Sequence, residues 1–304
     1  MERTLRDRTV LVTGGAGFIG RKLVGALVED NEVRVLDDGS TGEPGELPES
    51  VEYVEGDVRD EKAVGAAMDG VDVVFHEAAV VSVAESVEEP ARTNDVNLSG
   101  TVAVLEAARR RDARVVFASS AAVYGRPSSV PVAETDPTDP LSPYGLQKLA
   151  ADRYVRMYAD LYDLETVALR YFNVYGRGQR GGDYAGVITA FLNRIRDGAP
   201  PVVHGDGSQT RDFVHVSDIV QANLFAATTD ATGEAYNVGT GTSVTIRELA
   251  ERLVSLSGAD LPVEFGPERT GDIQDSEADV SKARERLGYD PQVSLDEGLA
   301  ELVE

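Results

Sequence analysis

A tyrosine and a lysine stand four positions apart at the start of a region with helical periodicity. Tyr144 and Lys148 follow Ser142 and Pro143, residue types that favour the N-cap and the first position of a helix. Their spacing places both side chains on one helical face. An ammonium about 4 Å from a phenol, at an effective dielectric of about 20, stabilises the phenolate by about 4 kcal/mol. The pair predicts that the pKa of Tyr144 falls from about 10 by at most about three units, because burial opposes the effect.

A pair of hydroxyl groups follows an apolar run at 114–118. Ser119 and Ser120 stand where that run ends. The carboxyl end of a parallel strand points into the ligand crevice, so Ser120 is expected to orient or relay a proton to Tyr144. We therefore predict Ser120, Tyr144 and Lys148 as the catalytic residues. The alternatives are a surface Tyr–Lys pair on a helix and an ordinary turn.

Three glycines stand between the first apolar run and the first helical pattern. Gly14, Gly17 and Gly20 follow the sequence VLVT in the spacing G-x-x-G-x-x-G. Glycines at this place allow a tight turn and let a pyrophosphate approach the backbone N–H groups at a helix N-terminus. The turn predicts a bound dinucleotide. The alternative is a plain strand-to-helix connection.

Acidic residues follow the second and third strands that the pattern predicts. Asp37 ends the second and is placed to accept hydrogen bonds from the adenosine ribose hydroxyls, where it would repel a 2′-phosphate. This favours NAD over NADP as the cofactor. Asp57 follows the third strand and is expected to accept a hydrogen bond from the adenine amino group.

These side chains require a scaffold of alternating strands and helices. Helical patterns near 17–29, 60–69, 90–111 and 143–162 separate short apolar runs at 9–13, 32–36, 51–54, 71–76, 114–118 and 166–170. Strands that are apolar on both faces belong to parallel sheets covered by helices. The fold class is therefore α/β, a Rossmann-type doubly wound parallel sheet.

The pattern changes after about residue 172. Short strands at 201–204, 213–216, 235–238 and 262–265 mix with helical patterns near 184–197, 217–229, 245–256 and 279–287. We expect residues 1–172 to form the dinucleotide-binding domain, with the chain returning to it near 213–238. Residues 173–304 are expected to form a smaller α+β lobe that binds the substrate.

Composition excludes several classes of protein. The chain has no cysteine and three histidines at no metal-ligand spacing, so we expect no metal site. Its net charge of −24 disfavours binding to nucleic acids and anionic membranes. The charged start MERTLRDRTV is not a signal-peptide pattern, and the longest uncharged stretch, 12 residues at 235–246, is too short to cross a bilayer. We expect a cytoplasmic protein adapted to high salt; a merely soluble acidic protein is the alternative.

Several motifs together resemble the extended short-chain dehydrogenases/reductases. The resemblance is carried by TGGAGFIG, HEAA at 76–79, SSAAVYG at 119–125 and YGLQK at 144–148. RYFNVYG at 170–176, GDGSQTRDFVHVSDI at 205–219 and RTGD at 269–272 are similar to the nucleotide-sugar epimerase and dehydratase branch. The resemblance covers essentially the whole chain, and its nearest likeness is to UDP-glucose 4-epimerases.

The resemblance implies further site residues. It assigns catalytic roles to Ser120, Tyr144 and Lys148, which match the family's catalytic positions. Cofactor contacts are implied for Gly14, Gly17, Phe18, Ile19, Gly20, Asp37, Asp38, Asp57, Val58, Ala78, Ala79, Asn97, Tyr144, Lys148 and Phe172. Substrate contacts are implied for Ser82, Ser120, Asn173, Val187, Val202, Arg211, Arg269 and Asp272.

The resemblance also implies a reaction. Tyr144 removes the proton of the sugar 4-hydroxyl while hydride leaves C4, and the 4-keto sugar turns over before hydride returns to its other face. NAD is regenerated. A 4,6-dehydratase is the nearest alternative. That class is expected to carry a pair resembling Asp-Glu, the acid and base for loss of water, at the positions where this chain has Ala121 and Ala122. A uronate decarboxylase, a 4-keto reductase and a non-catalytic nucleotide-sugar-binding protein also remain open.

Two positions bear on substrate and cofactor contacts. The pattern of the larger epimerases has a lysine at the position of Val81. The resemblance therefore implies that the cofactor contact of that lysine is absent here. Ser276 matches the position that limits substrate size, and its small side chain predicts that N-acetylated hexoses are accepted as well as simple ones.

An apolar face on the helix expected at 143–162 bears on assembly. Its members are Leu146, Leu149, Ala150, Arg153, Tyr154, Met157 and Leu161. Part of this face must cover the sheet. The resemblance suggests that the rest, with the helix near 97–111, pairs in a homodimer.

Overall fold

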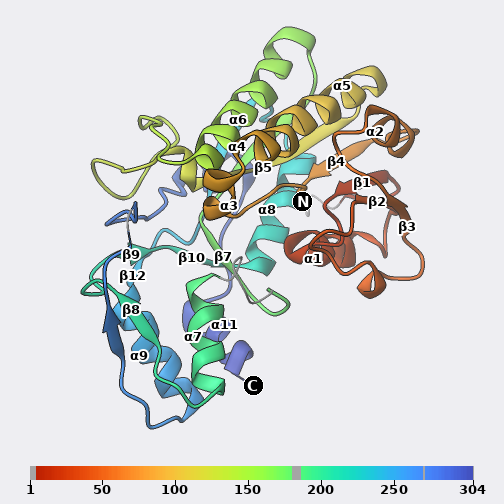
Figure 1. Ribbon diagram of the computed structural model, residues 1–304. Helices are drawn as coiled ribbons and strands as arrows, with labels where there is room; N and C mark the ends of the chain where they lie inside the picture. Colours follow the sequence, from red (N-terminus) through yellow and green to blue (C-terminus); the bar gives the residue numbers. More distant parts are fainter. Residues whose placement is uncertain (1–4, 180–185, 270, 304) are drawn as a thin grey trace.

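A seven-stranded parallel sheet forms the centre of the molecule (Figure 1). The computed structural model describes residues 5–179, 186–269 and 271–303. The strand order is β3-β2-β1-β4-β5-β6-β11, and every neighbouring pair is parallel. The strands are β1 (Thr9–Thr13), β2 (Glu32–Asp37), β3 (Glu52–Glu55), β4 (Val73–His76), β5 (Arg114–Ser120), β6 (Thr166–Tyr171) and β11 (Glu234–Val238). The predicted Rossmann-type sheet is confirmed.

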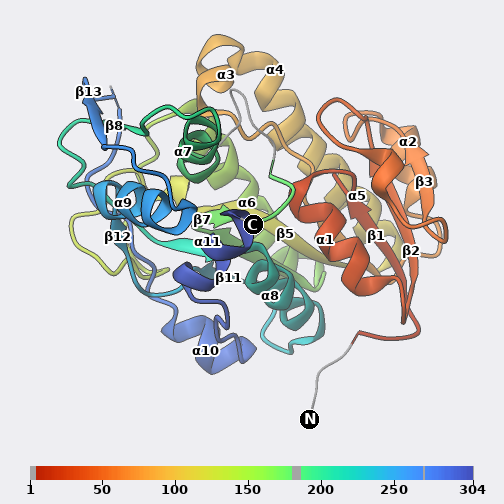
Figure 2. The same ribbon diagram turned by 90° about the horizontal axis from the view of Figure 1, so that it is seen from below.

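Helices cover both faces of this sheet (Figures 1 and 2). One face carries α1 (Phe18–Leu27), α8 (Val216–Thr228) and α10 (Ser281–Leu287). The other carries α2 (Glu61–Ala67), α5 (Thr101–Arg111) and α6 (Pro143–Tyr162). Successive strand residues face opposite layers, so Val10 and Val12 pack under α1 while Leu11 between them packs under α5. This is why the strands are apolar on both faces.

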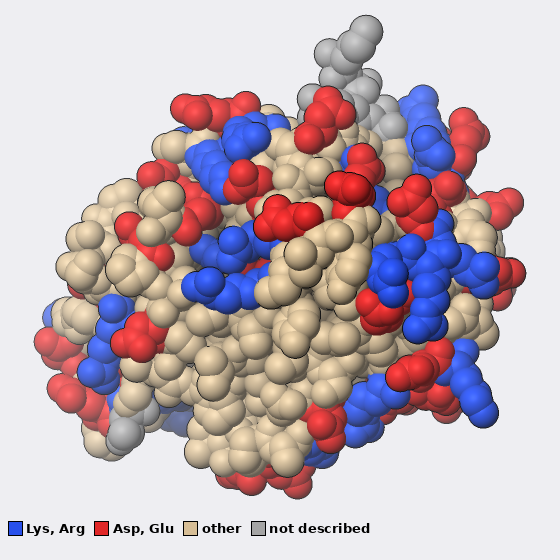
Figure 3. All heavy atoms as spheres, turned by 90° about the horizontal axis from the view of Figure 1, so that it is seen from above, with Lys and Arg blue, Asp and Glu red and all other residues tan. Residues whose placement is uncertain are grey.

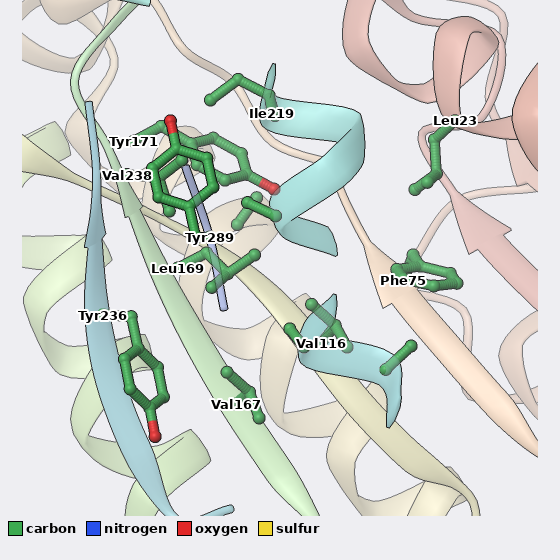
Figure 4. Close-up of a cluster of buried hydrophobic side chains, with 14 of the residues drawn as sticks. Leu23, Phe75, Val116, Val167, Leu169, Tyr171, Ile219, Tyr236, Val238 and Tyr289 are labelled. Carbon is green, nitrogen blue, oxygen red and sulfur yellow. The ribbon is translucent and has the colours of Figure 1, made fainter. Parts of the chain in front are cut away.

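The core under α8 holds the side chains of the central strands (Figure 4). Val116, Val167 and Leu169 of β5 and β6 are fully buried and belong to the same cluster as Ile219 of α8. Tyr171, at the end of β6, is 6% exposed and lies at the top of this cluster. The packing fixes the strand ends from which the candidate site projects.

A second, smaller lobe is built from α7 (Val187–Arg196), α9 (Ile246–Ser257), α11 (Leu295–Val303) and three strand pairs. The pairs are β7 (Asn173–Tyr175) with β10 (Phe213–His215), β8 (Val202–His204) with β13 (Glu264–Gly266), and β9 (Thr210–Arg211) with β12 (Val244–Thr245). The lobe has its own core, which includes Phe191, Val203 and Leu249. The chain leaves it to form α8 and β11 on the main sheet.

The elements depart from the sequence-based expectations in a few places. The helix expected over 90–111 consists of α4 (Pro90–Asn94), a π-helical stretch η2 (Asp95–Gly100) and α5. Helices α3 (Val83–Glu88) and α11 were not predicted, and neither were the short strands β7, β9 and β12. Short 3-10 turns, η1 (Pro44–Glu46) and η3 (Ala121–Val123), complete the elements. Residues 184 and 185 of an expected helix lie outside the described residues.

The sequence predicts no membrane-spanning helix. Within residues 5–179, 186–269 and 271–303, each helix is too short or too polar to cross a bilayer.

Candidate active site

The candidate site lies where four central strands end. Gly14 follows β1, Glu77 follows β4, Ser120 ends β5 and Tyr171 ends β6. Because these strands are parallel, their carboxyl ends meet at one edge of the sheet. Helix α6 begins beside this edge, since its first turn contacts η3 directly after Ser120.

The glycine turn forms a cradle made of backbone. Gly14 has a φ of +70°, and a Cβ there would lie 2.6 Å from the backbone nitrogen of Ala78. A Cβ on Gly20 would overlap the carbonyl oxygen of Gly14 and lie 2.7 Å from Cα of Gly15. Gly17 is the N-cap of α1, where N–H groups are free to bind an anion. The cradle fits the pyrophosphate of a dinucleotide.

Asp37 is held rigidly beside this cradle. Its two carboxylate oxygens accept hydrogen bonds from the backbone N–H groups of Ala16 at 3.0 Å and Gly39 at 2.9 Å. Burial raises the pKa of Asp37, and the two hydrogen bonds oppose that rise. An acceptor fixed at the end of β2 fits recognition of a ribose with free hydroxyls.

The neighbouring acidic residues are also engaged. Asp38 accepts hydrogen bonds from the backbone and the hydroxyl of Ser40. Asp57 accepts from Nε of Arg59 with both oxygens, each at 2.9 Å, and the hydrogen bonds from Arg59 lower its pKa. The adenine contact expected of Asp57 stays a prediction.

Ser120 and Tyr144 are brought together at the sheet edge. The hydrogen bond with the Ser120 hydroxyl lowers the pKa of Tyr144, whereas burial, the larger cause, raises it. Ser120 Oγ also accepts from the backbone N–H of Ala122 at 3.1 Å, which fixes the hydroxyl. The backbone N–H of Tyr144 donates to Ser86 Oγ of α3 at 3.1 Å. The phenol and the Ser120 hydroxyl therefore face each other at the sheet edge.

Lys148 lies one turn further along α6. Its ammonium donates to the carbonyl oxygen of Ala118 at 2.8 Å and lies 4.9 Å from the ring centre of Phe117. Burial lowers the pKa of Lys148 to about 8, and the carboxyl of Glu77 opposes this. The prediction that the pKa of Tyr144 lies below its usual value is wrong. Desolvation of the phenolate dominates there, and the ammonium is committed to Ala118.

Asn97 and His76 serve the scaffold of the site. The Asn97 side chain accepts from the backbone N–H of Val80 at 2.8 Å and donates to the Val80 carbonyl and to Gln147 Oε1, both at 2.9 Å. It thus ties the loop after β4 to α6. His76 contacts the hydroxyls of Thr13 and Thr101, and burial lowers its pKa to about 3, so the imidazole is neutral.

The remaining predicted cofactor residues surround the same edge. Phe172 is 6% exposed, and its backbone N–H donates to the carbonyl of Val238 at 3.0 Å. The others lie in the first turn of α1, in the loop after β3 and in the loop after β4, and they are Phe18, Ile19, Val58, Ala78 and Ala79.

Most of the predicted substrate residues lie in the smaller lobe, whereas Ser82 and Ser120 belong to α3 and β5. Arg211 of β9 forms an ion pair with Asp272 and donates to the Thr210 carbonyl at 2.6 Å. The carbonyl of Arg269 accepts from the Asp272 N–H at 3.3 Å. These contacts bring the side chains of Arg211 and Asp272 together and place the backbone of Arg269 in the same turn as Asp272. Two arginines at this turn would suit the charge of a diphosphate.

The other expected substrate residues occupy separate elements. Asn173 Nδ2 of β7 donates to the Asp212 carbonyl at 3.2 Å. Ser82 caps α3, its hydroxyl accepting from the Glu85 N–H at 3.1 Å. Val187 begins α7 and Val202 begins β8. Ser276 is 6% exposed.

A buried polar chain at the site was missed by the sequence reasoning. Asn223 of α8 donates to the Tyr171 hydroxyl at 2.7 Å, which donates to Glu77 Oε1 at 2.9 Å. Burial raises the pKa of Glu77 to about 7. A carboxyl directly after a buried strand was the available signal, but its partners come from elements about 94 and 146 residues later in the chain.

A family model matches most of the chain. The model describes the NAD dependent epimerase/dehydratase family, and it matches residues 10–239. That range contains the glycine turn, Ser120, Tyr144 and Lys148.

Known proteins resemble the chain over nearly its full length. The UDP-glucose 4-epimerase of Mycolicibacterium smegmatis is 41% identical over 303 residues, with 97% of each chain covered. A structure of UDP-N-acetylglucosamine 4-epimerase from Methanobrevibacter ruminantium, in complex with UDP-N-acetylmuramic acid, has a TM-score of 0.95 and 37% identity, covering 98% of both chains. A Thermus thermophilus UDP-glucose 4-epimerase in complex with NAD has a TM-score of 0.88 and 36% identity, covering 97% of both.

Proposed function

The chain belongs to the NAD dependent epimerase/dehydratase family, and we propose that it inverts C4 of a UDP-linked hexose through a transient 4-keto intermediate. It is an NAD-dependent enzyme similar to UDP-glucose 4-epimerases. The observation that carries the choice of reaction is a phenol, Tyr144, that faces the Ser120 hydroxyl, with no carboxyl group in the turn that follows. Such a site can move one proton, which is what inversion through a ketone requires.

The proposed mechanism assigns one task to each side chain. Tyr144 accepts the proton of the sugar 4-hydroxyl and returns it to the ketone oxygen, and Ser120 orients both groups by its hydrogen bond. Lys148, one turn further along α6 and bonded to the Ala118 carbonyl, would supply positive charge on the helical face of Tyr144 when the phenolate forms. When bound, NAD supplies the acceptor and donor of hydride. Gly14, Gly17 and Gly20 would hold its pyrophosphate, and Asp37 would hold its adenosine ribose.

Most of the proposed substrate contacts lie in the smaller lobe. Arg211 and Arg269 would bind the diphosphate, with Asp272 fixing the guanidinium of Arg211. Asn173, Val187 and Val202 would line the nucleotide site, and Ser82 the sugar site. The buried Ser276 belongs to the segment that runs from Asp272 to Ala278, and its small side chain favours room for an N-acetyl group.

The other reactions of the family fit less well. A 4,6-dehydratase needs an acid and a base to remove water, but Ala121 and Ala122 occupy η3 after Ser120. A uronate decarboxylase or a 4-keto reductase would use the same tyrosine, so the reaction products distinguish these enzymes from an epimerase. A non-catalytic binding protein would not need Tyr144 and Lys148 one turn apart.

The test is to incubate the purified protein with UDP-glucose, UDP-galactose or their N-acetyl analogues, without added cofactor. Interconversion of the C4 epimers is expected for both pairs. Release of a 4-keto-6-deoxy sugar or of carbon dioxide would instead identify a dehydratase or a decarboxylase. Rejection of the N-acetyl pair alone would remove the argument from Ser276 and leave the epimerase.

We also propose that the protein is a homodimer formed through α6 and α5. Leu146, Tyr154, Met157 and Leu161 of α6 are between 40% and 62% exposed and recur at helical spacing. Figure 3 views the molecule from this side and shows a broad uncharged area bordered by charged side chains. An exposed apolar face of this kind favours association.

Replacing Met157 with Glu is expected to halve the mass measured by sedimentation equilibrium, since a charge would then face the partner helix. Leu256→Glu is the matched control, because Leu256 is 40% exposed on α9 and Met157 is 44% exposed. A wild-type protein that sediments as a monomer would contradict the proposal.

The acidic composition leads to a proposal about solvent conditions: the protein is a cytoplasmic enzyme adapted to high salt. It has 53 acidic residues against 29 basic ones. Salt shortens the Debye length from about 10 Å at 0.1 M to about 3 Å at 1 M and so weakens the net repulsion. We expect the thermal midpoint to rise steadily between 0.1 and 2 M KCl, as followed by circular dichroism. An unchanged or falling midpoint would contradict it.

A further inference from the structure

Glu77 places a carboxyl group inside the site that the reaction described above does not use. It follows β4 directly, and its backbone N–H donates to the Thr13 carbonyl at 3.0 Å, which fixes its Cα beside the glycine turn. A Cβ on Gly14 would lie 2.9 Å from the Glu77 carbonyl carbon. The backbone of Glu77 is therefore part of the cofactor cradle.

The side chain of Glu77 is held by hydrogen bonds from residues of β6 and α8. Tyr171 donates its hydroxyl hydrogen to Glu77 Oε1 at 2.9 Å. The Tyr171 hydroxyl in turn accepts from Asn223 Nδ2, which also donates to the Ile219 carbonyl of α8 at 2.9 Å. Figure 4 shows Tyr171 on β6 next to α8. The chain of donors ends at Glu77 and is oriented to stabilise a carboxylate.

Lys148 needs a counter-charge that its hydrogen bond does not provide. It is 3% exposed, and its ammonium contacts a carbonyl oxygen and an aromatic ring. The parallel register of β4 with β5 pairs His76 with Phe117, so the next residues, Glu77 and Ala118, stand side by side, and the ammonium binds the Ala118 carbonyl. The charge of Glu77 at this position favours the charged form of Lys148. The effect is mutual, since Lys148 favours the carboxylate of Glu77.

We propose that Glu77 is a positioning residue whose carboxylate, held by Tyr171 and Asn223, keeps the ammonium of Lys148 charged beside Tyr144. This inference deepens the proposed function, on which it rests for the role of Lys148. It assigns to the residue after β4 the task of maintaining the positive charge that the phenolate of Tyr144 requires.

The groups that face Glu77 and Lys148 determine how the charge of Lys148 depends on pH. These are Glu77 itself, Tyr171 from β6, Tyr144 from α6 and His76 from β4, whose pKa of about 3 keeps it neutral. Burial lowers the pKa of Lys148 to about 8, so its charge is lost as the pH rises through that value. Without the carboxylate, the charge is lost at a lower pH.

The test measures the titration of Lys148 itself. The chain has only four lysines, Lys22, Lys62, Lys148 and Lys282. Lysine labelled with ¹³C at Cε therefore gives four NMR signals, and Lys148→Arg identifies the one that belongs to Lys148. In the protein as purified, Glu77→Gln is expected to lower the titration midpoint of Lys148 by about one pH unit.

Glu134→Gln is the matched control. Glu134 is a partly buried carboxyl that accepts from the Asn237 N–H at 2.7 Å, and burial raises its pKa, but its charged neighbours are Lys282 and Arg170. It should leave the Lys148 midpoint unchanged. Equal midpoints for Lys148 in the wild type and in Glu77→Gln would overturn the proposal, whether or not the protein is an epimerase.

A second variant covers the case in which Glu77→Gln does not fold. Tyr171→Phe keeps the ring in the core and removes the donor to Glu77, so it should shift the Lys148 midpoint in the same direction by a smaller amount. In both variants the alkaline limb of the pH–kcat profile should move to lower pH with the Lys148 midpoint. A limb that stays in place while the midpoint moves would separate Lys148 from the reaction and so contradict its role beside Tyr144.

Discussion

Replacement of Tyr144 by phenylalanine is expected to lower kcat for C4 inversion by about 10³-fold. The change removes one oxygen, that of the phenol at the start of α6, which faces the Ser120 hydroxyl at the end of β5. General acid–base catalysis contributes roughly 10²- to 10⁴-fold in enzymes. The ring remains, so its packing at the start of α6 should be little changed. Initial rates with UDP-galactose at saturation, coupled to detection of UDP-glucose, measure the effect.

Tyr162→Phe is the control for this substitution. Tyr162 ends the same helix, is 48% exposed and lies far along the chain from Ser120, so its loss should leave kcat within twofold. Tyr144→Phe should also keep its content of NAD, since the glycine turn is untouched. A variant that retains most of its kcat would assign the proton transfer to another group.

Gly20→Ala is expected to remove bound NAD from the purified protein and to lower its stability by about 1–3 kcal/mol. The new methyl group would overlap the Gly14 carbonyl oxygen and press on Cα of Gly15. Both are backbone atoms of the turn that fits the pyrophosphate, so the turn itself must open. NAD released on denaturation and the midpoint of thermal unfolding measure the two effects.

The same helix provides a matched control. A Cβ on Gly25, in α1, would have no atom within 4 Å. Gly25→Ala should therefore raise stability by up to about 1 kcal/mol, because alanine favours the helix, and should keep NAD. Equal NAD content in Gly20→Ala and Gly25→Ala would show that the turn does not hold the cofactor.

Much of this site follows from sequence because its geometry is local. The glycine turn, Asp37 at the end of β2, and Tyr144 and Lys148 on α6 each depend on a few consecutive residues and on the period of one element. The order of apolar runs also defines most strands of the sheet. The short helices α3 and α11, the short strands β7, β9 and β12 of the smaller lobe, and the π-helical η2 inside an expected helix departed from the pattern.

The electrostatics of the site could not be obtained in this way. A spacing of four residues shows that Tyr144 and Lys148 share a face, but not that the ammonium bonds to Ala118 or that desolvation raises the pKa of the phenol. Glu77 was missed for the same reason. Its significance depends on Tyr171 and Asn223, which reach it only in the folded protein.

The most direct test of the account follows a deuterium atom at C4 of the sugar. Purified protein is given UDP-[4-²H]glucose in ordinary water without added cofactor, and the UDP-galactose formed is analysed by NMR and mass spectrometry. The account predicts that the product keeps its deuterium at C4, because the same hydride leaves and returns within one site. Product that carries hydrogen from water at C4, or no product at all, would contradict it.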